Sequence, residues 1–390
     1  MWKILKIAAP VMVVLSIVVT FSLTGCELLT SSMPSSSENG MELFEEAWGV
    51  VLNDYVDIDE VDLDELSRGA IRGMLEALDD PYTSYLDTEH YEYTHRNYEG
   101  SFGGIGAEIS VDQDDQLIVV APIVGTPAER EGLLPGDKIL EVDGQSTEGM
   151  STMEAVLIIR GEPGTQVTLT ILHEGEDVSQ DIVITREIIN VDSVYMEMLD
   201  DGVAHIDVRY FSNRTADEMI SAIEDLLEYD ATGVILDLRS NPGGVLTAAV
   251  DAASLFLDEG VVVSVLDNVG ESDVWVVRDM EITTDLPLAV LVNENSASAS
   301  EVVAGALQDY GRGYIIGTTT YGKGSVNHIR QLSDGSAIYI TIARWYTPDG
   351  RLIEGLGITP DETVEFTIDD MEQGRDPQLE RAIEYITNQG

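Results

Sequence analysis

The chain has 390 residues, of which 44% are hydrophobic, so it is long enough for two or three domains with apolar cores. It carries 72 acidic and 20 basic residues, and the formal net charge of −52 argues against nucleic acid as a partner. The acidic residues are spread along the sequence rather than clustered, which predicts a strongly solvated acidic surface.

A secretory leader is predicted over residues 1–25. Two lysines precede an apolar run, 7–23, and the run ends in Leu-Thr-Gly-Cys, which resembles a bacterial lipobox. Cys26 is the only cysteine, so no intramolecular disulfide can form, and its place after the leader favours lipidation. The alternative is an uncleaved anchor, because the apolar run is long enough to span a bilayer. We expect an extracytoplasmic protein held at a bacterial membrane, in the periplasm or on the outer face, with 26–40 as a flexible tether.

Residues 41–100 are predicted to be mostly helical. Apolar residues recur at helical spacing in two stretches, 43–55 and 63–78. Asp80-Pro81 ends the second stretch, because the residue before a proline avoids helical backbone. Apolar stripes of this kind are core or interface residues.

Residues 101–187 are predicted to form a compact, mainly β module. A glycine-rich stretch, 102–107, leads into one strand, and a Pro-Gly-Asp turn at 135–137 leads into another. The pair resembles a PDZ domain, in which backbone N–H groups hold a terminal carboxylate while a strand edge pairs with the peptide. The residues expected to bind a peptide C-terminus are Gly103, Gly104, Ile105 and Gly106.

From residue 188 to residue 390 the pattern becomes αβ. We expect a strand at 204–209, an amphipathic helix at 215–229 and a buried strand at 233–239. The last of these runs into Ser-Asn-Pro-Gly-Gly at 240–244. A glycine pair after a strand could expose N–H groups to a ligand, and the alternative is a simple turn with no ligand.

A further apolar strand, 287–292, is followed by Ser-Ala-Ser-Ala-Ser at 296–300 and by a helix that Gly311 ends. A serine at a helix start is well placed for acyl chemistry. Free N–H groups there point at whatever the serine attacks, and the helix dipole favours developing negative charge. Serine is a weak nucleophile and needs a base.

A short strand at 314–317 leads to Lys323, which lies between two glycines. Lysine can act as a base if burial lowers its pKa, whereas arginine cannot be deprotonated in a protein. The chain has only four lysines, and two of them lie in the predicted leader. Placing one of the other two here favours catalysis over the alternative of a surface hairpin.

Together these stretches resemble the carboxyl-terminal processing peptidases, also called tail-specific proteases, which use a serine–lysine dyad. The motifs that carry the resemblance are the glycine pair, the serine-rich turn and the glycine-flanked lysine. The resemblance implies Ser298 as the nucleophile and Lys323 as the base. It also implies an oxyanion hole made by the N–H groups of Gly244 and Ala299, with Gly243 as the second choice for the first donor.

Two more positions take a role from the resemblance. The family usually has Gln four residues after the lysine, and this chain has Asn327, which keeps the amide but is one methylene shorter. We predict that Asn327 orients Lys323. Arg160, in a Leu-Ile-Ile-Arg-Gly stretch, is implied to couple the PDZ domain to the peptidase, and the alternative is a surface arginine after a helix.

The implied fold is α/β and multidomain, with an N-terminal helical arm and a PDZ-like β module placed before an αβ serine peptidase core of the ClpP/crotonase-like kind. The implied function is a membrane-tethered serine endopeptidase that recognises free protein C-termini and cleaves near them. The helical arm of the family often dimerises, so a homodimer is expected. No cofactor is expected, and the five scattered histidines lack the spacing of a metal site.

Two rival interpretations stay open. One is a non-catalytic, membrane-anchored PDZ scaffold with a degenerate peptidase fold, for which Asn327 is the main support. The other is a Ser-His-Asp triad with His328 as the base. His328 lies five residues after Lys323, so on a strand it would point to the opposite face.

Overall fold

The computed structural model describes residues 37–88, 90–91, 100–112, 116–173, 175–176, 178–270 and 272–389. The predicted leader, Cys26 and most of the predicted tether lie outside these residues. Among the described helices, none combines the length and apolar character needed to cross a bilayer. The chain divides into two compact units, Met1–Ile71 and Arg72–Gly390.

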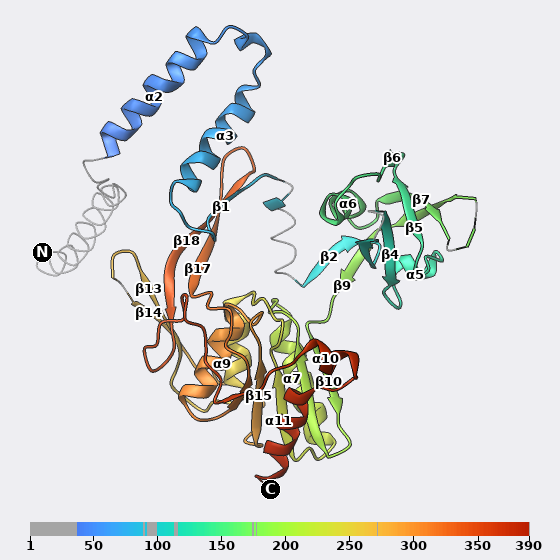
Figure 1. Cartoon of the computed structure of the whole chain (residues 1–390), viewed down its shortest axis with the longest axis vertical. Helices are drawn as coiled ribbons and strands as arrows, with labels where there is room; N and C mark the ends of the chain where they lie inside the picture. The colour runs from blue at the N-terminus through green and yellow to red at the C-terminus, as the bar shows by residue number, and fades with distance from the viewer. Residues whose placement is uncertain are drawn as a thin grey trace, which may run out of the picture. The chain divides into compact units, whose positions relative to one another are not determined.

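The first unit is helical in its described part. Its helices are α2 (Ser37–Asp54), the 3-10 turn η1 (Ile58–Glu60) and the first part of α3 (Leu63–Glu76) (Figure 1). The two predicted helical stretches are thus confirmed. Apolar side chains of both stretches, including Phe44, Trp48 and Leu66, line a groove of about 550 Å³.

The second unit contains the β module (Figure 1). Its strands are β3 (Ala107–Val111), β4 (Leu117–Pro122), β5 (Lys138–Val142), β6 (Gln145–Ser146), β7 (Gln166–Leu172) and β8 (Gln180–Thr185). They form one sheet in the order β3-β4-β5-β7-β8, with β6 on β5. Alternate residues of β7 point into the module's core with Leu117 and Ile139, as a half-buried strand requires.

Two helices and a strand pair complete the module. The helices are α5 (Pro127–Arg130) and α6 (Thr152–Ile159). β2 (Ser101–Gly104) at the start of the module pairs antiparallel with β9 (Glu187–Asn190) at its end. The two ends of the module therefore lie side by side.

The peptidase-like core is built on a six-stranded sheet. Its order is β10 (Val194–Met198), β11 (Val203–Val208), β12 (Gly233–Asp237), β15 (Leu288–Val292), β16 (Tyr314–Gly317) and β19 (Glu362–Thr363). All neighbours are parallel except β10 and β11. The strands predicted within this region are confirmed to within two residues at each end.

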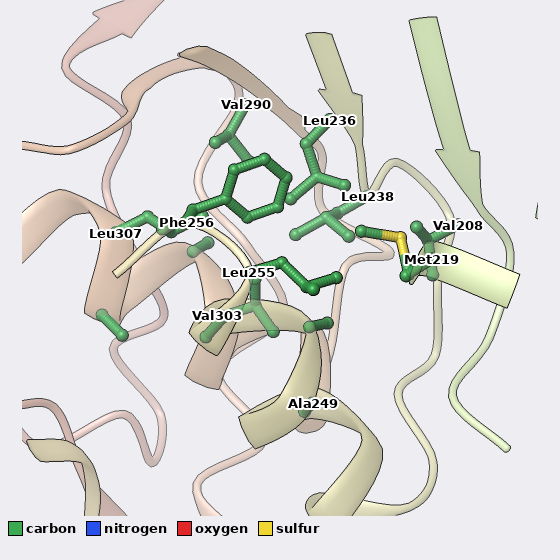
Figure 2. Packing of buried hydrophobic residues seen from close by; sticks show 14 of the residues in the cluster. Val208, Met219, Leu236, Leu238, Ala249, Leu255, Phe256, Val290, Val303 and Leu307 are labelled. Atoms are coloured by element: carbon green, nitrogen blue, oxygen red, sulfur yellow. The ribbon is translucent and has the colours of Figure 1, made fainter. Parts of the chain in front are cut away.

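Helices cover both faces of this sheet. They are α7 (Thr215–Glu228), α8 (Leu246–Ser254) and α9 (Ala299–Asp309) on one face and α11 (Pro377–Thr387) on the other. Leu236 and Val290 pack against the first face's helices (Figure 2), whereas Ile235 packs against Ala382 and Ile386 of α11. Burial on both faces explains why these strands read as continuous apolar runs.

The second unit contains a further sheet in addition to the six-stranded core sheet. It has the order β1 (Ser84–Leu86), β18 (Ala337–Tyr346), β13 (Val261–Asp267) and β14 (Ser272–Val276), and β17 (Ser325–Gln331) also pairs with β18. A short helix, α10 (Ile368–Glu372), precedes α11. The helical pattern predicted for 41–100 did not foresee β1, which takes its partner from more than 250 residues further along the chain.

Candidate active site

The predicted site residues follow three neighbouring strands of the parallel sheet. Gly243 and Gly244 come after β12, Ser298 after β15 and Lys323 after β16. Carboxyl ends of parallel strands meet at one edge of the sheet, which is where open α/β sheets bind ligands. The topology therefore directs these three segments to the same edge.

Ser298 occupies a sharp turn directly before α9. Its backbone has φ 56° and ψ −116°, a left-handed conformation that is strained for a residue with a side chain. The turn is fixed from behind, because Ala297 N–H and Ser300 Oγ both donate to the carbonyl of Asn241. The side chain of Ser298 is half-buried, while Ala299 after it is fully buried.

The glycine pair leaves one N–H group for a ligand. The N–H of Gly243 donates to Asn241 Oδ1 at 2.8 Å and is thus used within the loop. The N–H groups of Gly244 and Ala299 have no acceptor among the described residues. This pattern favours Gly244 over Gly243 as an oxyanion donor, the order that the family resemblance implies, and the catalytic role itself stays a prediction.

Only glycine fits at these two positions. A Cβ on Gly243, whose φ is +98°, would lie 2.7 Å from the Cβ of Ser298. A Cβ on Gly244, whose φ is +140°, would lie 2.0 Å from the carbonyl oxygen of Phe211. The glycine pair therefore lets its loop pack directly against the turn that carries Ser298.

Glu301 joins the serine turn to the lysine loop. It is fully buried, and its carboxylate accepts hydrogen bonds from the N–H groups of Ser298 (2.8 Å), Gly322 (2.7 Å) and Lys323 (2.9 Å) and from Thr320 Oγ1 (2.6 Å). Burial raises the pKa of the Glu301 carboxyl, and the four hydrogen bonds oppose this effect. One side chain thus fixes the backbones of both predicted dyad residues.

The amine of Lys323 lies among aromatic rings. Its Nζ is 5.1 Å from the ring centre of Tyr82 and 6.0 Å from that of Tyr339. Burial lowers the pKa of the Lys323 amine, and the negative charges of Glu354 and Glu301 only partly oppose the shift. A lowered pKa is what a lysine base requires, because only the neutral amine accepts a proton.

Asn327 is held by partners other than the lysine. Its Nδ2 donates to the carbonyl of Tyr82 and to Thr341 Oγ1, each at 3.0 Å, and its Oδ1 accepts from Ser325 Oγ at 3.1 Å. No hydrogen bond among the described residues joins Asn327 to Lys323. Its predicted orienting role, which stays a prediction, therefore has no direct contact behind it in this structure.

A cavity of about 240 Å³ lies beside Ser298. Its apolar lining comes from Val245, Leu246, Val326, Ile329, Tyr339 and Trp345. A space of this size and character suits an apolar side chain of a peptide next to the serine. His328 is exposed and does not line the cavity, in agreement with the prediction that it points away.

The predicted peptide-binding residues form the start of the β module. Gly103 and Gly104 are the end of β2, and Ile105 and Gly106 lead into β3, which is the first strand of its sheet. The ring of Phe102 lies on the same stretch. Its centre is 3.7 Å from the guanidinium carbon of Arg160.

Arg160 is the residue predicted to couple the PDZ domain to the peptidase. Arg160 and Phe102 line a second cavity, of about 510 Å³, whose other lining residues include Gly243 and Gly244. The structure thus brings Arg160 to the same cavity as the glycine pair, and its role in coupling stays a prediction. Within the described ranges, no three or more His, Cys, Asp or Glu side chains are grouped so that they could hold a metal ion.

Sequence reasoning missed two residues of this region. Glu301 has a local signal, since Ser-x-x-Glu at 298–301 is a helix-start pattern in which the acid reaches back to the serine N–H. Tyr82 has no such signal, because its place beside Lys323 depends on pairing between distant strands.

Comparison with known proteins decides the family. The sequence model of peptidase family S41 matches residues 202–364, that of the PDZ domain 97–172 and that of the activating protease CtpB N-terminal domain 23–90. The carboxy-terminal processing protease CtpA of Bacillus subtilis is 37% identical over 354 residues, which span 91% of this chain and 75% of that protein. The chain belongs to peptidase family S41.

Other S41 relatives agree with this assignment. A carboxyl-terminal-processing protease of Synechocystis is 39% identical over 82% of this chain and 76% of its own length. Among solved structures, the photosystem II D1 C-terminal processing protease is 32% identical, with a TM-score of 0.50 over 83% of this chain and 92% of that one. The predicted family, the α/β multidomain fold and the serine-type peptidase activity are therefore confirmed.

Proposed function

We propose that this S41 peptidase cleaves peptide bonds with a dyad of Ser298 and Lys323 near the free C-termini of its protein substrates. The observation that carries the dyad is Glu301. Its buried carboxylate binds the backbone N–H groups of both residues, at 2.8 Å and 2.9 Å, so the two segments are built as one site. The lowered pKa of Lys323 supports its role as the base.

The reaction begins with proton transfer from Ser298 Oγ to the neutral amine of Lys323. The serine oxygen forms a bond to the peptide carbonyl carbon, and the carbonyl oxygen becomes an oxyanion. The N–H groups of Gly244 and Ala299 donate hydrogen bonds to this oxyanion, helped by the N-terminus of α9. Lys323 then gives its proton to the leaving amine, and the peptide C–N bond breaks.

The second half returns the enzyme to its starting state. A water molecule attacks the acyl-enzyme, and Lys323 takes a proton from it. The ester bond to Ser298 breaks, and its oxygen is reprotonated by the lysine. Lys323 thus acts twice as base and twice as acid.

We assign substrate recognition to the PDZ domain. A substrate with a free C-terminus would place its carboxylate at Gly103, Gly104, Ile105 and Gly106. Its backbone would pair with β3, which lies at the end of its sheet in the described part of the module. The apolar residues Ile105, Ala155 and Ile159 of this region favour an apolar terminal side chain.

We further propose that lipid on Cys26 holds the mature enzyme at the membrane, on its extracytoplasmic side. The supporting features are the apolar leader, the lipobox-like sequence and the lone cysteine. Pairing of two copies through the N-terminal helices is proposed from the apolar groove between α2 and α3.

The proposal is tested by hydrolysis of matched peptides by the full-length protein in detergent. Peptides with a free apolar C-terminus should be cleaved, and amidated peptides of the same sequence should be cleaved with a raised KM, because amidation removes the terminal charge. Equal KM for both would contradict recognition of the carboxylate. Absence of cleavage together with tight binding of free-acid peptides would favour the non-catalytic scaffold instead.

A further inference from the structure

A short segment before the PDZ domain is anchored beside the candidate active site. β1 pairs antiparallel with β18, with Ser84 opposite Tyr339. Thr341 N–H donates to Thr83 Oγ1 at 3.1 Å, and Thr83 Oγ1 donates to Asp80 Oδ2 at 2.7 Å. These contacts hold the turn between Asp80 and β1 against the sheet that carries β17.

Tyr82, at the tip of this turn, contacts Lys323 and the strand that follows it in two ways. Its ring centre lies 5.1 Å from Nζ of Lys323. Its carbonyl accepts the hydrogen bond from Asn327 Nδ2 at 3.0 Å. Burial, with the nearby Tyr321 hydroxyl, raises the pKa of Tyr82 to about 12, so the Tyr82 hydroxyl stays neutral.

We propose that Tyr82 is a positioning residue for Lys323: its ring forms a wall beside the amine, and its carbonyl, through Asn327, holds the strand that follows the lysine. The inference rests on the proposed function, in which Lys323 is the base. It assigns a catalytic purpose to a segment that lies outside the peptidase core in sequence, more than 200 residues before the lysine.

Two effects of the ring on Lys323 oppose each other. An aromatic face attracts an ammonium group, which favours the protonated amine. The same ring excludes water from the amine, which favours the neutral form. Burial is the largest influence on the pKa of Lys323, and the net direction is downward. The charged and titratable groups that face the amine are Tyr82, Tyr339, Glu354 and Glu301.

The first test measures the lysine directly. Full-length protein is labelled with an amine-reactive reagent across a pH series, and the labelling of Lys323 is quantified by peptide mass spectrometry with Lys138 as internal reference. In Tyr82→Leu the labelling midpoint of Lys323 should move to higher pH, because water reaches the amine. In Tyr82→Phe it should stay near the wild-type midpoint. An unmoved midpoint in a folded Tyr82→Leu protein would overturn the inference.

The second test follows the rate. In Tyr82→Leu, kcat at neutral pH should fall about tenfold or more, as expected for a displaced catalytic group, and part of the loss should return at alkaline pH. KM should change little. The matched control is Tyr85→Leu, which removes a ring from the neighbouring strand without a contact to the lysine. A loss of the same size at every pH would show only structural damage and would refute the positioning role.

A third variant keeps an aromatic ring at this position. Replacing Tyr82 by pentafluorophenylalanine keeps the ring but reverses its electrostatic face, so the midpoint of Lys323 should fall below that of Tyr82→Phe. Equal midpoints would mean that the ring does not face the amine. Labelling does not depend on turnover, so a Tyr82 effect on the Lys323 midpoint in protein that keeps Ser298 but hydrolyses no peptide would uphold the contact and reject the proposed function.

Discussion

At the scale of single residues, the candidate site depends on backbone positions that allow few alternatives. Ser298 has a positive φ, and Gly244 has a φ that side chains rarely adopt. A strained residue of this kind persists only where its surroundings hold it, and here Glu301 and Asn241 supply the hydrogen bonds that do so. The strain therefore lies at the residues to which we assign chemistry.

Gly244→Ala should lower kcat by at least about a hundredfold, the effect of losing one oxyanion donor. The added Cβ would meet the carbonyl of Phe211 and force the loop, with its N–H group, away from Ser298. The measurement is steady-state hydrolysis with circular dichroism to confirm folding. Gly311→Ala is the control, because Gly311 also has a positive φ but has open space around it, so only stability should drop, by about 1 kcal/mol. Full activity in folded Gly244→Ala would contradict the oxyanion assignment.

At the scale of elements, the ends of three parallel strands position the site, and one strand pairing completes it. β12, β15 and β16 supply the glycine pair, the serine and the lysine, while β17 and β18 bring Asn327 and Tyr339 beside them. Asn327 joins β17 to β18 and to the turn that contains Tyr82. An effect of Asn327 on the lysine would therefore run through Tyr82.

Asn327→Ala should lower kcat far more than it raises KM. Loss of its amide frees the Tyr82 turn and a wall of the lysine pocket, while the cavity for the substrate side chain keeps its apolar lining. Asn327→Gln should be tolerated, because it keeps the amide groups. The measurement is separate determination of kcat and KM, with exposed His328→Ala as the neighbouring control. An unchanged kcat in Asn327→Ala would show that the enzyme works without this residue.

A partly buried ion network links β10, β11, the end of β12 and the start of α11. His205 hydrogen-bonds Asp237 at 3.1 Å and Glu197 at 3.2 Å, and Arg239 joins Asp237 to Asp376. Burial alone would lower the pKa of His205, but hydrogen bonds and charges from Asp237 and Glu197 raise it overall. A raised pKa in the folded state stabilises the fold fully below the unfolded value of about 6.5.

Replacing His205 by Gln should therefore destabilise the protein most at mildly acidic pH. The difference in free energy of unfolding from wild type should shrink as pH rises through the folded-state pKa of His205, because both chains are then neutral at this position. Urea unfolding at a series of pH values measures this difference in free energy of unfolding. The control is His328→Gln, which shows the effect of replacing an exposed histidine. A difference that grows with pH would contradict the assignment.

Local patterns sufficed to predict β12, β15, β16 and the helices α7 and α9, because each is an apolar run or a periodic stripe with clear end signals, whereas α8 was not predicted. They also located the glycine pair and the lysine. They could not predict β1 or Tyr82, whose positions depend on pairing with β18 far along the chain. The hydrogen bonds of the Asn327 amide could likewise not be predicted, because its partners lie in three separate segments.

At the scale of the whole molecule, the enzyme combines parts that single elements cannot supply. The PDZ domain is inserted between the paired strands β2 and β9 and belongs to the same compact unit as the peptidase core. A substrate C-terminus bound by the PDZ domain would therefore be held in the unit that contains the peptidase site. The high negative charge keeps the surface solvated and would repel anionic lipids, so the proposed membrane retention rests on the predicted anchor and not on surface attraction.

The central claim is that Ser298 is acylated with Lys323 as its base. The most direct measurement is mass spectrometry of full-length protein quenched in acid during turnover of a free-acid peptide, combined with kcat for Ser298→Ala, Lys323→Ala and the control Lys138→Ala. We predict an acyl adduct on Ser298, loss of several decades of kcat in the first two folded variants and an unchanged rate in the third. Turnover by Ser298→Ala at the wild-type rate, or an adduct on another residue, would contradict the account.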